Sequence, residues 1–172
     1  MERLKNLFVL KYQESPDRIE PLKGDASDRR IYRLSNAHRS VVGIIGENRA
    51  ENRAFLEFSR HFKKFGLNVP EIYIENLEQG VYLEEDLGDD TLFLWMNQIR
   101  EQEGFSDRII TMYQKVIEAL PHFQITAGKS IDYSLCYQYM EFAEESMSWD
   151  LQYFKQRFLD MFYKKSINET AL

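Results

Sequence analysis

The sequence predicts an α+β protein in which a five-stranded antiparallel sheet with one inserted helix is followed only by helices. Two observations lead to this prediction. Before Gly88, short runs rich in β-branched and aromatic residues alternate with turn residues, and one segment of helical periodicity lies among them. After Gly88, apolar residues recur only at the spacings of three and four that indicate helices.

The first 46 residues predict one short helix and three strands. Leu4, Leu7 and Phe8 recur at helical spacing within residues 2–12, and the turn-forming residues 15–17 end that helix. Three β-rich runs follow, and the Gly, Asn and Asp residues between them favour tight turns. We expect these strands at residues 19–23, 30–34 and 40–45.

The clearest periodicity in the chain predicts an amphipathic helix at residues 49–65. Asn48 is suited to cap its first turn, and Gly66 is suited to end it in a left-handed conformation. The following Val69-Pro70 pair prevents the helix from continuing. The apolar stripe of this helix consists of Phe55, Phe58, Phe62 and Phe65.

Glu51 belongs to the same stripe, one turn before Phe55. A carboxylate on such a face needs a cationic partner or the favourable dipole of the helix N-terminus. The spacing favours the second explanation, in which Glu51 stabilises the first turn. A functional role for this carboxylate requires a cation from the strand that faces the helix.

Two more strands are predicted at residues 71–74 and 81–83, joined by the turn 78–80. They lead into an acidic cluster around Gly88 that has no histidine nearby and lacks the spacing of a calcium loop. The cluster is therefore interpreted as a solvated connector in preference to a metal site. Its members are Glu84, Glu85, Asp86, Asp89 and Asp90.

Three helices are predicted beyond Gly88. Thr91 is suited to cap the first and Ser106 the second, which Pro121 ends or kinks. A last helix is expected near residues 147–162. Its apolar positions are Met147, Leu151, Phe154, Phe158 and Phe162.

The composition excludes several classes of protein. Hydrophobic residues make up 44 % of the 172 residues, which is enough for a packed core and excludes intrinsic disorder as a class. The formal charge of −6 disfavours nucleic acid as a partner. The single cysteine, Cys136, excludes a disulfide framework and a cysteine-based zinc site. Because no apolar run reaches membrane-spanning length and the N-terminus carries no export signal, we expect no membrane association and a cytoplasmic location.

The turn Gly24–Arg29 lies between two predicted strands and is a candidate anion site. Its backbone N–H groups, the Ser27 hydroxyl and the flanking arginines suit a phosphate. An ordinary hairpin turn has the same kind of composition. Both interpretations are open on the residues alone.

Four segments carry a resemblance to a known family, and they occur in the same order as in that family. They are Gly24–Leu34, Glu51–Leu56, Phe65–Glu71 and Tyr82–Gly88. Together they resemble the aminoglycoside phosphotransferase and choline kinase-like family. The closest likeness is to the bacterial branch that phosphorylates the cell-wall amino sugars N-acetylmuramate and N-acetylglucosamine at the anomeric carbon, and residues 149–155 also look like a helix of that branch. The resemblance implies a protein kinase-like fold, with a nucleotide-binding N-terminal lobe at residues 1–88 and the helical start of a C-terminal lobe at residues 89–172.

The resemblance also implies a set of nucleotide contacts. The turn at residues 24–30 is similar to the loop that covers the nucleotide, and the carbonyl of Glu85 and the N–H of Leu87 take the places that hydrogen-bond to adenine. The full implied set is Gly24, Asp25, Ala26, Ser27, Arg29, Arg30, Ile44, Glu51, Glu85 and Leu87.

Ile44 is a departure from the family pattern. It lies where many members carry the lysine that holds the α- and β-phosphates, and Glu51 matches the helix glutamate that pairs with that lysine. Because this lysine is missing, we expect another cation, Arg30 or Arg33, to pair with Glu51.

The resemblance implies ATP as the phosphate donor, with Mg²⁺, and an aspartate that orients the acceptor hydroxyl. No His-x-Asp or Asp-Phe-Gly-like element occurs in these residues. We therefore expect the catalytic aspartate and the Mg²⁺ ligands in a segment beyond Leu172, and no catalytic or metal-binding residue within this chain. Aromatic residues from Trp149 to Phe162 would then be uncovered, which predicts a completing segment or a second copy as a partner.

The expected function is ATP-dependent phosphorylation of a small hydroxylated substrate, in particular an amino sugar, with the chain as an N-terminal portion that is inactive alone. The alternative is a catalytically inactive module that binds a nucleotide or a protein partner through a kinase-like lobe. A ligand-free α+β domain is the third interpretation, and the four ordered segments argue against it.

Overall fold

The computed structural model describes residues 1–23 and 28–162, and the chain divides into two compact units, Met1–Leu135 and Cys136–Leu172. In the first unit, the helices are α1 (Glu2–Tyr12), α2 (Arg49–Lys64), α3 (Leu92–Glu103) and α4 (Asp107–Pro121). The strands are β1 (Arg18–Leu22), β2 (Arg30–Ser35), β3 (Ser40–Ile45), β4 (Ile72–Asn76) and β5 (Val81–Glu85).

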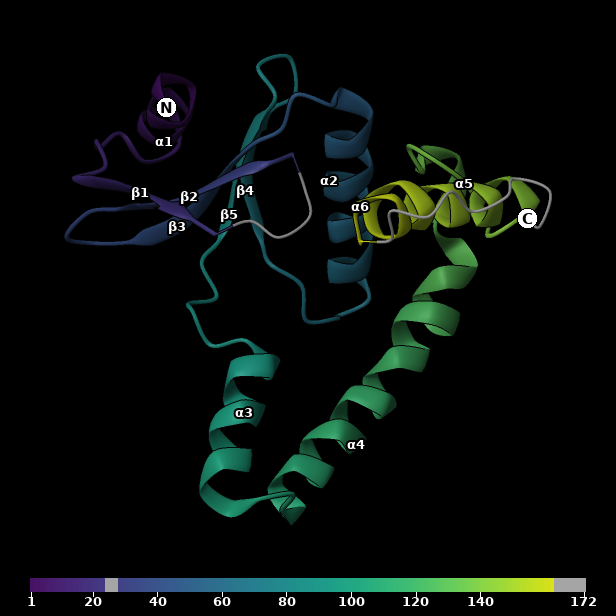
Figure 1. The fold of residues 1–172 in the computed structure, drawn as a ribbon. Coiled ribbons are helices and arrows are strands. Elements are labelled where there is room, and N and C mark those ends of the chain that lie inside the picture. The colour runs from purple at the N-terminus through teal and green to yellow at the C-terminus, as the bar shows by residue number, and fades with distance from the viewer. Residues whose placement is uncertain (24–27, 163–172) are drawn as a thin grey trace. The chain divides into compact units, whose positions relative to one another are not determined.

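The five strands form one antiparallel sheet in the order β1-β2-β3-β5-β4 (Figure 1). This topology confirms the predicted antiparallel sheet with one inserted helix, because α2 lies between β3 and β4 in the sequence. The register aligns Ile31, Ile44 and Tyr82 across β2, β3 and β5. Side chains alternate between the two faces of a strand, so each face of the sheet has its own layer of packing.

Helix α1 covers one face of the sheet, on the side opposite α2 (Figure 1). Leu4, Leu7 and Phe8 are buried, as their helical spacing predicted. They pack against a layer of strand residues that are themselves almost fully buried. These strand residues are Leu34, Val41, Ile45, Val81 and Leu83.

Helix α2 packs on the opposite face, where Leu56 joins Ile44 and Tyr82 in a second apolar cluster. The Asn48 side chain accepts a hydrogen bond from the backbone N–H of Glu51 at 3.1 Å, so the predicted cap is confirmed. Gly66 has a φ of +71° directly after the helix, as predicted for its end. The most deeply buried positions of α2 are Asn52, Ala54, Leu56 and Ser59, and the phenylalanine stripe lies at the margin of the contact.

A buried amide links the start of α2 to the turn between β4 and β5. The Asn52 side-chain Nδ2 donates to the carbonyl of Gly46 at 2.7 Å, and the N–H of Gly46 donates to the carbonyl of Gly80 at 2.9 Å. Gly80 has a φ of +63°, and a Cβ at this position would collide with the Gly46 carbonyl. Glycine is therefore required at position 80 both by backbone conformation and by the lack of space.

Beyond the sheet, the Thr91 hydroxyl accepts a hydrogen bond from the N–H of Leu94 and caps α3 as predicted. Ser106 occupies the N-cap position of α4 but makes no capping hydrogen bond. Pro121 is the last residue of α4, and the backbone continues as a π-helix, η1 (His122–Ala127). Pro121 therefore changes the helical geometry and does not stop the helix. Two short 3₁₀ turns, η2 (Gly128–Ser130) and η3 (Tyr133–Leu135), complete this unit.

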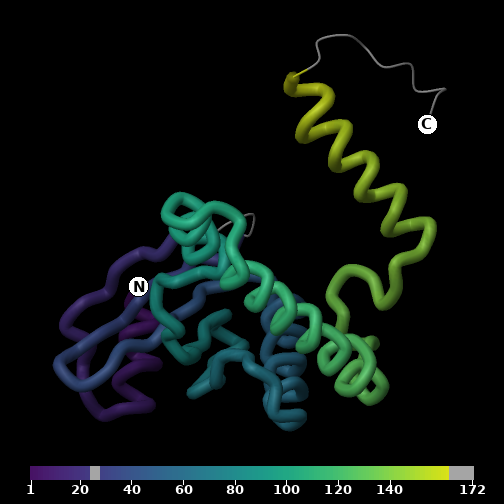
Figure 2. The backbone as a smooth tube through the Cα atoms, turned by 90° about the horizontal axis from the view of Figure 1, so that it is seen from below, coloured from purple at the N-terminus to yellow at the C-terminus, as the bar shows by residue number. Residues whose placement is uncertain are grey.

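The second unit contains α5 (Glu144–Phe154), the π-helix η4 (Lys155–Leu159) and α6 (Asp160–Phe162), which follow one another without a break (Figure 2). The predicted last helix is present, and it begins three residues earlier than expected. Its aromatic side chains are exposed: the exposed fraction is 43 % for Trp149 and 68 % for Phe162. This confirms the predicted uncovered aromatic surface.

None of the helices within residues 1–23 and 28–162 is long and apolar enough to cross a membrane.

Candidate functional site

Arg29, directly before β2, has a side chain that contacts three residues on the α2 face of the sheet. A terminal nitrogen of its guanidinium lies 2.9 Å from the Glu51 carboxylate. The other terminal nitrogen donates to the Tyr82 hydroxyl at 3.4 Å, and the guanidinium carbon lies 5.0 Å from the centre of the Phe55 ring. The ion pair is largely shielded, since the side chains of Arg29 and Glu51 are only 16 % and 24 % exposed.

The prediction that Arg30 or Arg33 pairs with Glu51 is therefore wrong, because Arg29 is the partner. Arg30 points to Glu47 at 3.2 Å, in an ion pair whose two side chains are mostly exposed. Arg33 pairs with Asp86 and Asp89. Successive residues of a strand face opposite sides, which places Arg30 on the other face from Arg29.

Arg33 clamps the segment that follows β5. Its Nε and one terminal nitrogen donate to the two carboxylate oxygens of Asp86 at 2.7 and 3.0 Å, and the other terminal nitrogen donates to Asp89 at 3.1 Å. The Ser40 hydroxyl also donates to Asp86. The hydrogen bonds from Arg33 hold the pKa of Asp86 below its usual value. Asp86 is thus a structural anchor, and the predicted solvated connector is wrong at this position.

Glu84 is the second exception to that prediction. It lies on β5 opposite Val42 of β3 and Ile72 of β4, and its Oε2 is buried with no hydrogen-bond partner among residues 1–23 and 28–162. Burial raises the pKa of the Glu84 carboxyl from 4.5 to about 7, and the positive charge of Arg29 opposes this rise. A carboxyl group with such a pKa is partly protonated at neutral pH.

Alternation along the strands places the side chains of Arg29, Ile31 and Arg33 on one face of β2. Tyr82 and Glu84 lie on the same face of β5, because the Tyr82 hydroxyl contacts Arg29. This face therefore carries an apolar middle flanked by two cations that are each bound by a carboxylate. We refer to it below as the charged face of the sheet.

Ile44 lies under α2 and is 3 % exposed. It is flanked by Ile31 and Tyr82 in the register of the sheet. A charged side chain at this position would be desolvated, whereas isoleucine contributes to the core. The position at which the family resemblance expects a lysine is therefore a packing position.

The predicted adenine contacts lie at the end of β5. The N–H of Glu85 donates to the carbonyl of Glu71 at 2.9 Å, and the Glu85 carboxylate accepts from the N–H of Glu71 at 3.1 Å. Leu87 is 67 % exposed. The segment thus leaves the sheet with Glu85 hydrogen-bonded to Glu71, directly before β4, and with Leu87 at the surface.

Only some of the other predicted nucleotide-binding residues lie close together in the structure. Gly24, Asp25, Ala26 and Ser27 lie outside the described residues. Arg29 and Glu51 are brought together, whereas Arg30 belongs to the opposite face. Sequence reasoning missed Tyr82 and Glu84 as part of the site. The period of two along residues 82–86 was the signal that could have assigned both to one face of the strand.

No group of three or more His, Cys, Asp or Glu side chains within the described ranges is arranged to hold a metal ion. In the described part of the chain, the carboxylates of Glu51, Asp86 and Asp89 are each bound by an arginine.

No protein-family model and no curated protein matches the sequence. The comparisons thus indicate no family. The function is inferred from the arrangement of Arg29, Glu51 and their neighbours.

Proposed function

We propose that this chain binds ATP as the nucleotide-binding part of an ATP-dependent phosphotransferase that acts on a small hydroxylated substrate, in particular an amino sugar. The observation that supports this proposal is the shielded Arg29–Glu51 ion pair, which links the end of the 24–29 turn to α2. It supplies, directly before β2, the cation that the family resemblance would place at position 44.

The pair suits a phosphate-binding role because arginine offers several N–H donors in a fixed plane. Glu51 and Tyr82 each contact one terminal nitrogen of the Arg29 guanidinium, and the Phe55 ring packs against its face. A guanidinium that is held in one orientation loses less conformational entropy when it binds an anion than a free lysine does. The resulting site is pre-organised for the oxygen atoms of a di- or triphosphate.

The apolar middle of the charged face suits the base of the nucleotide. Ile31 and Val42 are diagonal neighbours on that face, since Ile31 pairs with Ile44 and Val42 with Arg33, and both are only half-buried. They separate the Arg29 end from the segment 85–87, which offers backbone groups at the edge of the sheet. A purine stacked on these side chains would place its phosphates toward Arg29.

The proposal assigns no group-transfer step to these residues. Phosphoryl transfer depends on positioning and on neutralising charge, and Mg²⁺ bound to the phosphates supplies much of the second. In this proposal, Arg29 contributes positive charge to that neutralisation.

Binding of ATP with Mg²⁺ to the full chain, measured by calorimetry, tests the role of Arg29. We expect Arg29→Met to weaken binding about tenfold or more, because one charge-assisted hydrogen bond corresponds to roughly 1.5–3 kcal/mol. Arg30→Met is the matched control, since Arg30 is adjacent in sequence but pairs with Glu47 at the surface. It should change the affinity less than about twofold.

Equal affinities of the wild-type protein and the Arg29→Met variant would contradict the proposal, provided that their circular dichroism spectra agree. Glu51→Gln separates positioning from direct contact. If Glu51 only positions the guanidinium, this variant should bind ATP more weakly than wild type but more tightly than Arg29→Met.

A second function, as a protein-interaction module, is favoured by a different observation. The aromatic side chains along α5, η4 and α6 are between 43 % and 68 % exposed. Several exposed aromatic residues on one helical segment indicate an interaction surface, whereas single exposed apolar residues are ordinary. Sedimentation velocity of the chain with and without ATP distinguishes the two functions. Self-association that is independent of ATP and is lost in Phe158→Ser would favour the interaction module.

A further inference from the structure

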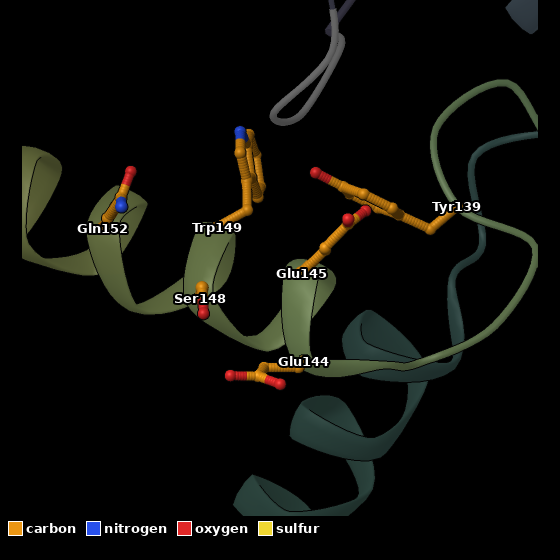
Figure 3. A pocket seen from close by; sticks show the side chains of 6 residues that line it. All are labelled: Tyr139, Glu144, Glu145, Ser148, Trp149 and Gln152. Carbon is orange, nitrogen blue, oxygen red and sulfur yellow. The ribbon is translucent and has the colours of Figure 1, made fainter.

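The Glu84 carboxyl on β5 differs from carboxylates at the surface because part of it is buried without a partner. Glu144 and Glu145, by comparison, project from the first turn of α5 at a hollow of about 600 Å³ (Figure 3), and both are exposed, so water satisfies their oxygen atoms. In Glu84, the Oε2 atom is buried and has no hydrogen-bond partner within residues 1–23 and 28–162. A buried oxygen without a partner is costly, so a ligand that supplies the missing hydrogen bond gains affinity.

Glu84 lies beside the apolar middle of the charged face. Its neighbours in the register are Val42 of β3 and Ile72 of β4, and neither side chain offers a hydrogen bond. Val42 is one of the two side chains on which the proposed function stacks the purine, so the edge of a base placed there meets the Glu84 carboxyl. The torsion that turns a terminal carboxyl is broad, and either oxygen can therefore face a ligand. The inference drawn from this placement rests on the proposed function.

The two protonation states of a carboxyl present different hydrogen-bonding patterns. A neutral carboxyl offers an O–H donor beside a C=O acceptor, whereas an ionised carboxylate only accepts. Adenine presents its N6 amino donor beside a ring-nitrogen acceptor, which is N1 on one edge and N7 on the other. Guanine presents two donors, N1–H and the N2 amino group, on one edge and two acceptors, O6 and N7, on another. The neutral carboxyl is thus complementary to adenine, and the carboxylate is complementary to guanine.

Both states of Glu84 are accessible near neutral pH. Burial raises the pKa of its carboxyl to about 7, and the positive charge of Arg29 opposes this rise. The other groups on this face keep their charge between pH 6 and pH 8. Arg29 and Arg33 stay protonated, the hydrogen bonds from Arg33 lower the pKa of Asp86, and burial raises the pKa of the Tyr82 hydroxyl above its usual value.

Helix α2 contributes three charged side chains toward this side of the sheet, Glu51, Arg60 and Lys63, and each is held in an ion pair. Their partners are Arg29, Glu75 and Glu71, respectively. These pairs are common to the wild-type protein and to a variant at position 84. A comparison of the two proteins therefore isolates the carboxyl of Glu84.

We propose that Glu84 is a specificity-determining residue that recognises the purine of the bound nucleotide, with the neutral carboxyl selecting adenine and the carboxylate selecting guanine. In the neutral form, the O–H donates to a ring nitrogen of adenine and the carbonyl oxygen accepts from the N6 amino group. Arg29 binds the phosphates in the proposed function, so different side chains recognise the base and the phosphates. The charge of one side chain then sets the preference between ATP and GTP.

Calorimetric titration of the full chain with ATP and with GTP, each with Mg²⁺, at pH 6 and at pH 8 tests this inference. The quantity compared is the ratio of the two dissociation constants at each pH. Both nucleotides carry the same triphosphate, so the binding of protons and Mg²⁺ to the phosphates cancels in that ratio. A carboxyl with a pKa of about 7 is about nine-tenths neutral at pH 6 and about one-tenth neutral at pH 8. We therefore expect the preference for ATP over GTP to fall at least about tenfold between pH 6 and pH 8.

Glu84→Gln keeps one hydrogen-bonding pattern at every pH, because a carboxamide offers a donor beside an acceptor and pairs with adenine in the same way as a neutral carboxyl. We expect this variant to prefer ATP at both pH values, with a ratio that changes less than about twofold. Glu78→Gln, in the exposed turn between β4 and β5, is the matched control and should reproduce the pH dependence of the wild-type protein.

A wild-type ratio that is the same at both pH values would overturn the inference, and so would a Glu84→Gln variant that retains the wild-type pH dependence. The first of these measurements does not depend on the folding of any variant. If the wild-type protein binds neither nucleotide, the proposed function fails and this inference fails with it. Binding of ATP with a ratio that is independent of pH overturns this inference alone.

Discussion

Glu84 provides a direct test of the electrostatics of the charged face. Its carboxyl is buried on β5, and its pKa rises from 4.5 to about 7 in the folded protein. In the unfolded chain, the same carboxyl releases its proton near pH 4.5. Between these two values the folded state binds more protons than the unfolded state, so the free energy of unfolding falls as the pH rises.

The magnitude follows from the difference between the two pKa values of Glu84. At 1.36 kcal/mol for each tenfold change in a dissociation constant, the rise corresponds to a loss of up to about 3 kcal/mol. Most of this loss occurs between pH 4.5 and pH 7. Because a glutamine does not titrate, Glu84→Gln should lack this contribution to the pH dependence.

The assay is urea unfolding of wild type and Glu84→Gln, followed by far-ultraviolet circular dichroism at pH 4.5 and at pH 8. The difference in unfolding free energy between the two proteins should shift by about 3 kcal/mol in favour of the variant at the higher pH. All other titrating groups are common to both proteins and cancel in this difference. A shift smaller than about 0.5 kcal/mol would refute the inference that folding desolvates this carboxyl.

Two further predictions concern stability. Asp86→Asn should lower the unfolding free energy at pH 7 by about 2 kcal/mol, because two charge-assisted hydrogen bonds from Arg33 lose their ionised acceptor. The lowered pKa of Asp86 means that this contribution is present above the ordinary value of 3.8 and disappears as the pH falls further; an equal effect of the substitution at pH 2.5 and pH 7 would contradict it. Gly80→Ala should lower the thermal unfolding midpoint far more than Gly66→Ala. Both residues have a positive φ, but only at Gly80 would a Cβ meet the Gly46 carbonyl. Similar midpoints for the two variants would show that the backbone conformation alone determines the loss of stability.

Local signals were sufficient to predict most of the fold. The side chains of Asn48 and Thr91 each accept a hydrogen bond from a backbone N–H three residues further along the chain. Their capping roles therefore depend only on the neighbouring sequence. The same holds for Gly66, whose effect is confined to the end of α2. The sheet was predictable because runs of β-branched residues alternate with turns, although its strand order depends on pairings between distant residues.

The candidate site was less predictable because its contacts join distant strands. Three arginines lie within five residues, and choosing the partner of Glu51 requires knowing which face each occupies and where along the strand it lies. Arg30 faces the other side, and Arg33, on the same face as Arg29, lies roughly 13 Å further along the strand. Burial of Glu84 likewise depends on β5 extending to residue 85, which the predicted strand at residues 81–83 did not include.

Ribosomal synthesis exposes α1 before all of its packing partners on the sheet exist. Phe8 and Leu4 fill the sheet only when Val81 and Leu83 of β5 are in place, because all four belong to one buried layer. At ~5–20 residues per second, the roughly 70 residues between them take on the order of 4–15 s to emerge. During that interval Leu34, Val41 and Ile45 of the same layer can already contact the apolar face of α1, whereas the part of that face that packs on Val81 and Leu83 stays uncovered.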